Sequence, residues 1–219
     1  MYIVLAGCSW ACGEWGLKKH TRYQVKHPGL SRYLQEAGHM VQITAVQGSD
    51  NLTQLALAHE QARPDGRVVF VQTDPVRSYY PTVARSHPEF HQQWDHHLQR
   101  LYQGLAELPC PTVLVGGNAP VRPALVPGGS QVQVAVEDWV QALVGHRPAA
   151  TFSRMWSYPD CDRQLLAEWE QEEHQLAEWD RQCRVPGTPE HEWFWPDGRH
   201  PNRQAHRWLA DLLLADHIR

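Results

Sequence analysis

The chain has 219 residues, and 42% of them are hydrophobic, which is enough for the core of one domain. Twenty Lys and Arg stand against 24 Asp and Glu, and no basic block occurs, so a nucleic-acid partner is not expected. No apolar run approaches the ~18 residues of a membrane span. The five Cys are irregularly spaced and no secretion signal begins the chain, so we expect free thiols and a cytoplasmic location.

Short apolar runs alternate with amphipathic patterns through the first two thirds of the chain. Strands are predicted at residues 2–6, 40–46, 67–72, 111–117 and 130–136. Helices are predicted at 29–38, after Asp50 as a cap, at 89–108 and at 136–144. This alternation indicates an α/β protein with a mostly parallel sheet of about five strands and helices on both faces.

The pattern changes in residues 146–196, which we interpret as an insertion or loop region within a single domain spanning 1–219. It holds a polar helical stretch at 162–183, the helical insertion expected near 160–184. Packing over the core is the favoured role for this helix. A role as a lid or as the arm of a homodimer is an alternative. Residues 185–202 are interpreted as a loop rich in aromatic residues and Pro, and a last helix is predicted at about 203–217.

Polar side chains follow several predicted strands, at the sheet edge where ligands bind in open parallel sheets. They are Ser9 after the first strand, Gly48 after the second, Thr73, Asp74 and Arg77 after the third, Asn118 after the fourth, and Asp197 and His200 before the last helix. A serine hydroxyl needs a base, and a neutral histidine can serve if a carboxylate holds its other ring nitrogen. In a tight turn, the spacing of Asp197 and His200 lets both side chains face one cleft. The backbone N–H groups of Ser9 and Gly48 can then donate to an oxyanion.

Three stretches together resemble the SGNH/GDSL hydrolase superfamily, over residues 3–77 and 195–213. "VLAGCSW" is similar to the first block of that family, "VQGSDN" to the second and "DGRHPNRQAHRWLADLL" to the last. The resemblance implies a flavodoxin-like three-layer sandwich. It also implies Ser9 as the nucleophile, His200 as the base and Asp197 as the residue that orients the base.

The sequence departs from the family pattern at two places. Cys8 stands where the family usually has Asp. Thr73 stands where the family has an Asn whose side chain donates to the oxyanion, so either the Thr73 hydroxyl or Asn118 is expected to replace it. Arg77 can bind a carboxylate or phosphate of the substrate or pair with Asp74, and the pair is slightly favoured.

The leading hypothesis is a serine esterase without cofactor that forms an acyl-enzyme on small esters or O-acetylated sugars. Trp193 and Trp195, beside Asp197, are candidates for lining its site. A binding or structural module that keeps the fold, and an acyltransferase with the same triad, stay open. A metal site at His87, His91, Asp95, His96 and His97 is disfavoured because no typical zinc spacing occurs. Nucleotide binding is disfavoured because no glycine-rich fingerprint occurs.

Overall fold

The computed structural model describes residues 1–18, 21–77, 88–147 and 163–218 of the chain. A sheet of five parallel strands lies at its centre, in the order β4-β1-β5-β6-β7. The strands of this sheet are β1 (Tyr2–Gly7), β4 (Met40–Ile43), β5 (Arg67–Gln72), β6 (Thr112–Gly116) and β7 (Val132–Val136). Numbered within the sheet alone, this is the order 2-1-3-4-5 of flavodoxin-like folds. The predicted α/β class and parallel sheet are thus confirmed.

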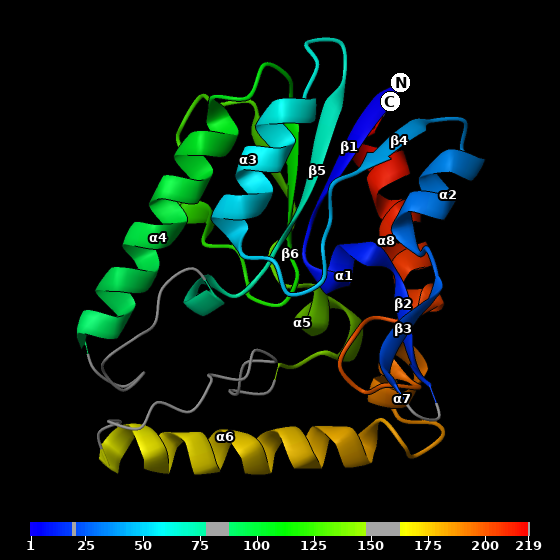
Figure 1. Cartoon of the computed structure of the whole chain (residues 1–219), viewed down its shortest axis with the longest axis vertical. Helices are drawn as coiled ribbons and strands as arrows, with labels where there is room; N and C mark the ends of the chain where they lie inside the picture. The colour runs from blue at the N-terminus through cyan, green and yellow to red at the C-terminus, as the bar shows by residue number, and fades with distance from the viewer. Residues whose placement is uncertain (19–20, 78–87, 148–162, 219) are drawn as a thin grey trace.

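Helices cover both faces of the sheet (Figure 1). They are α1 (Ser9–Cys12), α2 (Leu30–Glu36), α3 (Asn51–Gln61), α4 (Pro88–Ala106), α5 (Trp139–Val144), α6 (Arg163–Gln182), α7 (Pro189–Phe194) and α8 (Arg203–Asp216), with the 3-10 turns η1 (Pro75–Arg77) and η2 (Pro123–Leu125). Helices α3 and α4 pack on one face of the sheet, and α1, α2, α5 and α8 pack on the other.

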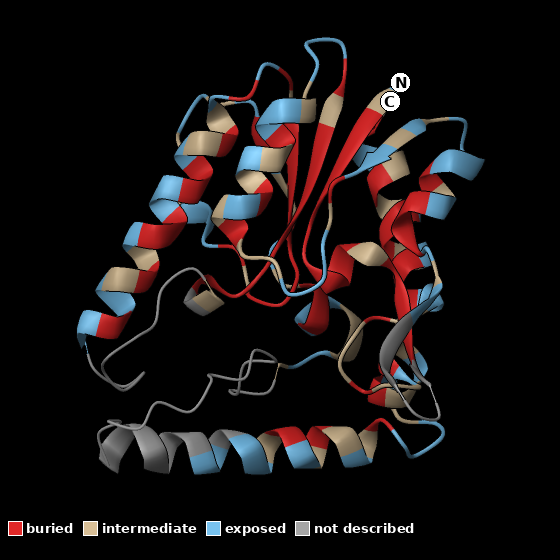
Figure 2. Cartoon of the chain, in the orientation of Figure 1, coloured by how far each residue is buried: buried red, intermediate tan, exposed pale blue. Residues whose placement is uncertain are grey.

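Alternation along the strands builds the two layers of the core. In β1, Ile3 and Leu5 point to the face that carries α8, whereas Val4 and Ala6 point to the face that carries α4. All four side chains are buried, as expected for a parallel strand covered on both sides. Figure 2 shows the same burial along the central strands, with exposed residues on the outer sides of the helices.

A two-stranded antiparallel hairpin between α1 and α2 was not predicted from the sequence. Its strands are β2 (Glu14–Lys18) and β3 (Thr21–His27). A period-2 alternation is present in Thr21–His27, where Thr, Tyr and Val alternate with Arg, Gln and Lys. This was the available signal for a strand.

Two further predictions were wrong, one of a strand boundary and one of a loop. The strand predicted at 40–46 ends at Ile43, although the N–H of Val46 still donates to the Gly7 carbonyl. The stretch 185–202, predicted as a loop, contains α7, which Thr188 caps by accepting the N–H of His191 on its hydroxyl oxygen. A Thr followed by Pro at the first helical position is a helix start, and the density of Pro and aromatic residues obscured it.

Helix α6 lies across the carboxyl edge of the sheet, beyond α1 and α5 (Figure 1). Leu176, Trp179 and, just past its end, Cys183 are buried in the core layer that also holds α8. The predicted packing of this helix on the core is therefore present at its C-terminal end. Among the described residues, no helix is both long and apolar enough to cross a membrane.

Candidate active site

Ser9 is the first residue of α1, directly beyond the carboxyl end of β1. The chain turns there at Gly7, whose φ of +144° disfavours any residue with a side chain. A Cβ at Gly7 would also lie 2.7 Å from the carbonyl oxygen of Val71. The glycine therefore lets the chain leave the sheet sharply and start α1 at Ser9, which is 3% exposed.

Hydrogen bonds join the side chains of Ser9, His200 and Asp197 in a row, and we call these three residues the relay. His200 Nε2 is 2.9 Å from Ser9 Oγ, and His200 Nδ1 is 2.7 Å from Asp197 Oδ2. With the ring proton on Nδ1, His200 donates to the carboxylate and accepts from the serine hydroxyl. These are the three side chains to which the family resemblance gives the roles of nucleophile, base and orienting residue, and such an arrangement can move a proton from the hydroxyl to the ring.

The turn that carries Asp197 and His200 is fixed from inside. Asp197 Oδ1 accepts the backbone N–H groups of Arg199 and His200, both at 2.9 Å. The Asp197 side chain is 1% exposed and that of His200 13%, so the carboxylate is buried behind the ring. The same carboxyl group thus shapes the turn and orients the imidazole.

Helix α6 holds this turn from outside. Trp179 Nε1 donates to the Gly198 carbonyl at 2.8 Å. A Cβ on Gly198 would meet Asp180 Oδ1 at 2.9 Å, and Gly198 has a φ of +70°. The C-terminal part of α6 therefore packs directly against the residues between Asp197 and His200.

The hairpin contributes two residues that the sequence analysis did not single out. Trp15 Nε1 donates to the Ser9 carbonyl at 2.7 Å, and the Trp15 ring lies against the His200 ring. Glu14 binds both the backbone N–H and the guanidinium of Arg203. Burial acts to raise the pKa of Glu14, but the hydrogen bonds and charge of Arg203 outweigh it and lower that pKa. No spacing in the sequence signals these contacts, because they join distant parts of the chain.

Gly48 lies in the turn between β4 and α3, with a φ of +75°. The turn closes through the N–H of Ser49, which donates to the Val46 carbonyl. Gln54, a buried residue of α3, ties this turn to the end of β1. Its amide donates to Ser49 Oγ, and its oxygen accepts the N–H of Gly7. Gln54 was not predicted as a site residue, yet it links the turn that carries Gly48 to the end of β1, two residues before Ser9.

Thr73 follows β5 and is 1% exposed. Its backbone N–H and carbonyl both bind the side-chain amide of Asn51, at 2.9 Å each. Its hydroxyl has no hydrogen-bond partner among the described residues. A buried hydroxyl without a hydrogen-bond partner lowers the stability of the fold unless a bound molecule supplies the missing partner.

Asn118 follows β6 and is completely buried. Its N–H donates to the Gln72 carbonyl, and its carbonyl accepts Arg147 Nη1 at 3.1 Å. Arg147 also forms a two-point ion pair with Asp138, the cap of α5. The backbone of Asn118 is thus held rigidly at the carboxyl end of its strand.

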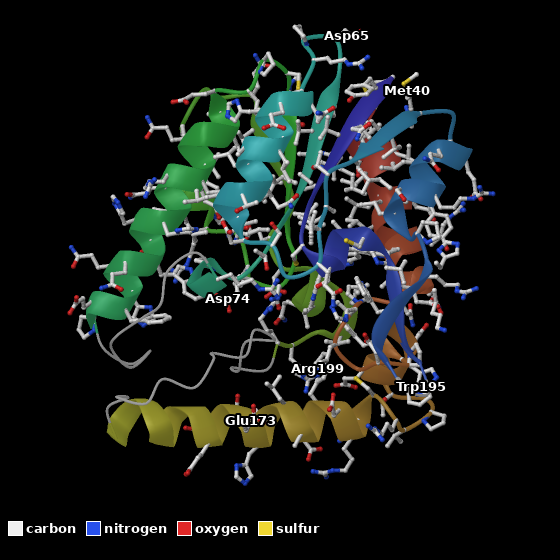
Figure 3. All side chains as sticks on the ribbon, viewed as in Figure 1. Met40, Asp65, Asp74, Glu173, Trp195 and Arg199 are labelled. Carbon is white, nitrogen blue, oxygen red and sulfur yellow. The ribbon has the colours of Figure 1, made fainter. Side chains whose placement is uncertain are left out.

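Asp74 and Arg77 lie in the loop after β5. Asp74 is completely buried, and its carbonyl accepts the N–H of Arg77. Arg77 Nη1 donates to the Ser49 carbonyl at 3.5 Å, which joins this loop to the one that carries Gly48. Figure 3 shows Asp74 and Arg199 on the side of the sheet that faces α6.

The thiols of Cys12 and Cys183 are not activated. Burial, with the neighbouring Cys8, raises the pKa of Cys12 to about 12. Burial, with Asp180 and other carboxylates nearby, raises the pKa of Cys183 to about 12. Both thiols stay protonated at neutral pH, and a protonated thiol is a poor nucleophile. Among the described residues, no three His, Cys, Asp or Glu are grouped to hold a metal ion; His87 lies outside those residues.

Comparisons with known proteins found no matching family model and no matching curated protein. Solved structures similar to this chain include the esterase EstA from Pseudoalteromonas sp., at 11% identity and a TM-score of 0.44, covering 98% of this chain and 94% of the other. A lipase/acylhydrolase from Enterococcus faecalis matches at 12% identity and 0.44, covering 98% and 94%. The acetylxylan esterase Axe2 from Geobacillus stearothermophilus matches at 14% identity and 0.41, covering 98% and 92%.

Proposed function

We propose that this protein is a serine hydrolase of the SGNH type that cleaves small esters through an acyl-enzyme on Ser9. The observation that carries the proposal is the pair of distances at His200, 2.9 Å to Ser9 Oγ and 2.7 Å to Asp197 Oδ2. These distances meet the requirement that a general base lie within hydrogen-bond reach of the proton it removes.

In the first half-reaction, Ser9 Oγ attacks the ester carbonyl carbon and its proton passes to His200 Nε2. The Asp197 carboxylate stabilises the imidazolium that forms. The tetrahedral intermediate collapses when the C–O bond to the alcohol breaks, and His200 gives its proton to the departing oxygen. The acyl group is then bonded to Ser9.

In the second half-reaction, water attacks the acyl carbon while His200 takes one of its protons. The bond to Ser9 Oγ breaks, His200 returns the proton to Ser9, and the acid leaves. Negative charge on the carbonyl oxygen needs fixed N–H or O–H donors in both halves. We assign the backbone N–H groups of Ser9 and Gly48 and the hydroxyl of Thr73, with Asn118 as the alternative to Thr73.

The assignment of Thr73 has one specific support. Its hydroxyl is buried and has no hydrogen-bond partner among the described residues. An oxyanion would accept a hydrogen bond from this group, which removes the cost of leaving it unbonded.

The direct test is intact mass after a fluorophosphonate probe, together with p-nitrophenyl acetate hydrolysis. We expect one covalent adduct on wild-type protein, none on Ser9→Ala, and loss of turnover in Ser9→Ala and His200→Ala. Wild-type protein without adduct or turnover would contradict the proposal and favour a binding module. Acyl transfer to an added alcohol in preference to water would instead assign an acyltransferase with the same residues.

The substrate class that we propose is small esters, O-acetylated sugars included. Trp195 is the candidate sugar contact, since it is 44% exposed two residues before Asp197. Its ring stacks on His191 at 5.4 Å, which fixes its orientation. Trp193 is partly buried against the core and offers less surface. Release of acetate from acetylated xylo-oligosaccharides, compared between wild type and Trp195→Ala, tests this.

A further inference from the structure

The hairpin places one side chain in contact with two members of the proposed relay. The indole N–H of Trp15 bonds to the carbonyl of Ser9 at 2.7 Å. The centroids of the Trp15 and His200 rings are 5.2 Å apart, with 33° between their planes. Trp15 is 5% exposed, so its ring shields the face of the imidazole that it covers from water.

The backbone around Trp15 allows little movement. Gly13 turns the chain from α1 into β2 with a φ of +127°, and a Cβ there would clash with the His27 carbonyl oxygen. Glu14 is 7% exposed and anchors the start of β2 to the first residue of α8 through Arg203. The strand that carries Trp15 is thus fixed at one end to the helix that follows His200.

Helix α1 also needs the contact. The helix is a single turn, so its carbonyl groups lack the partners that a longer helix supplies. Trp15 Nε1 provides the partner for the Ser9 carbonyl. Loss of this bond would leave a buried acceptor unsatisfied beside the proposed nucleophile.

We propose that Trp15 is a positioning residue that holds Ser9 and His200 in register for proton transfer. It acts by bonding the Ser9 backbone and by packing on the face of the His200 ring. Its role in turnover rests on the proposed hydrolase function, whereas its restraint of the His200 ring does not. An aromatic face against an imidazole also favours the cationic ring that forms during the reaction.

The test compares Trp15→Leu, which removes both contacts, with Trp15→Phe, which keeps the ring contact and loses the N–H. Trp94→Phe is the matched control, a buried Trp that packs on Phe90 in the core layer of α4. We expect Trp15→Leu to lower kcat on the order of 10²-fold, the scale of a small misplacement, while KM changes less than about twofold. Trp15→Phe should recover part of this loss, and Trp94→Phe should leave kcat unchanged.

A second readout is independent of turnover. The Nδ1–H of His200, held by Asp197 at 2.7 Å, should give a low-field proton resonance, assigned by its loss in His200→Gln. We expect exchange with water to broaden it in Trp15→Leu and not in Trp94→Phe. If wild-type protein shows neither adduct nor turnover, the hydrolase proposal fails and the resonance alone decides the role of Trp15.

Two results would overturn the inference. One is a Trp15→Leu protein with the kcat and the resonance of the Trp94→Phe control. The other is a rise in KM with kcat and the resonance unchanged, which would make Trp15 a substrate contact. If Trp15→Leu does not fold by circular dichroism, the same comparison is made with Trp15→Phe, for which a smaller loss of kcat is expected and wild-type values overturn the role.

Discussion

Ser9 and His200 approach to 2.9 Å, although one follows the first strand and the other precedes the last helix. The loop after β1 and the turn before α8 meet at the carboxyl edge of the sheet, beside α6. Asp197 completes the arrangement from within the same turn as His200. The chemistry that we propose depends on this one meeting point.

Replacing Asp197 with Asn should lower kcat/KM for p-nitrophenyl acetate on the order of 10³–10⁴-fold. The amide can offer its N–H₂ to the ring, which favours the tautomer that cannot accept the Ser9 proton. Asp211→Asn is the control, because Asp211 lies exposed on α8 and, among the described residues, pairs only with Arg207. Activity within about threefold of wild type in Asp197→Asn would remove Asp197 from the mechanism.

Thr73→Val should lower kcat on the order of 10²–10³-fold if the Thr73 hydroxyl donates to the oxyanion. Thr112→Val is a close control. Thr112 is also buried with an unpartnered hydroxyl among the described residues, but it begins β6 at the opposite edge of the sheet. Equal activity of the two variants would exclude the Thr73 hydroxyl, and Asn118→Ala would then be measured.

The buried His206 predicts a loss of stability in mild acid. Burial lowers its pKa from 6.5 to about 4. In the pH range between these values, the His206 ring stays neutral in the folded protein but binds a proton in the unfolded chain. The free energy of unfolding should therefore be highest above pH 6.5 and fall towards pH 4. The loss from this group between pH 7 and pH 5 is about 2 kcal/mol.

Urea unfolding at several pH values measures this effect. His206→Leu should flatten the pH dependence even if it lowers stability at neutral pH, whereas His174→Gln, an exposed position on α6, should not. The same slope in wild type and His206→Leu would assign the acid sensitivity to other groups.

Cys12 and Cys183 should resist iodoacetamide at pH 8 in the folded protein. Burial raises the pKa of both thiols to about 12, so the reactive thiolate is scarce. Peptide mass mapping should find both modified only after unfolding in urea. Rapid modification of Cys12 in the folded state would reopen the question of which side chain beside α1 is the nucleophile.

The sequence predicts the central sheet well because its signals are local. Buried apolar runs mark β1 and β5, and Asp50 caps α3 through the N–H groups of Leu52 and Thr53 as expected. The proximity of Asp197 and His200 was also predictable, since the spacing lies within one turn.

The parts that the sequence did not predict depend on contacts between distant residues. Nothing in the sequence distinguishes Trp15 from the other nine Trp residues, and its contact with His200 forms only in the folded chain. The sequence presents Gln54 and Asn51 as polar residues of an amphipathic helix, yet both are buried. Gln54 binds the backbone N–H of Gly7 at the end of β1, and Asn51 binds the Thr73 carbonyl in the loop after β5. Such roles are set by tertiary packing, which hydrophobic periodicity does not encode.

The pairing of Ser9 with His200 also bears on how the chain would recover from denaturant. Residues near opposite ends of the sequence must be brought together, and closing so long a loop is slow compared with forming local helices. Return of probe reactivity at Ser9 should therefore lag behind the return of helical circular dichroism. The rate at which the probe labels Ser9 would then report the last stage of folding.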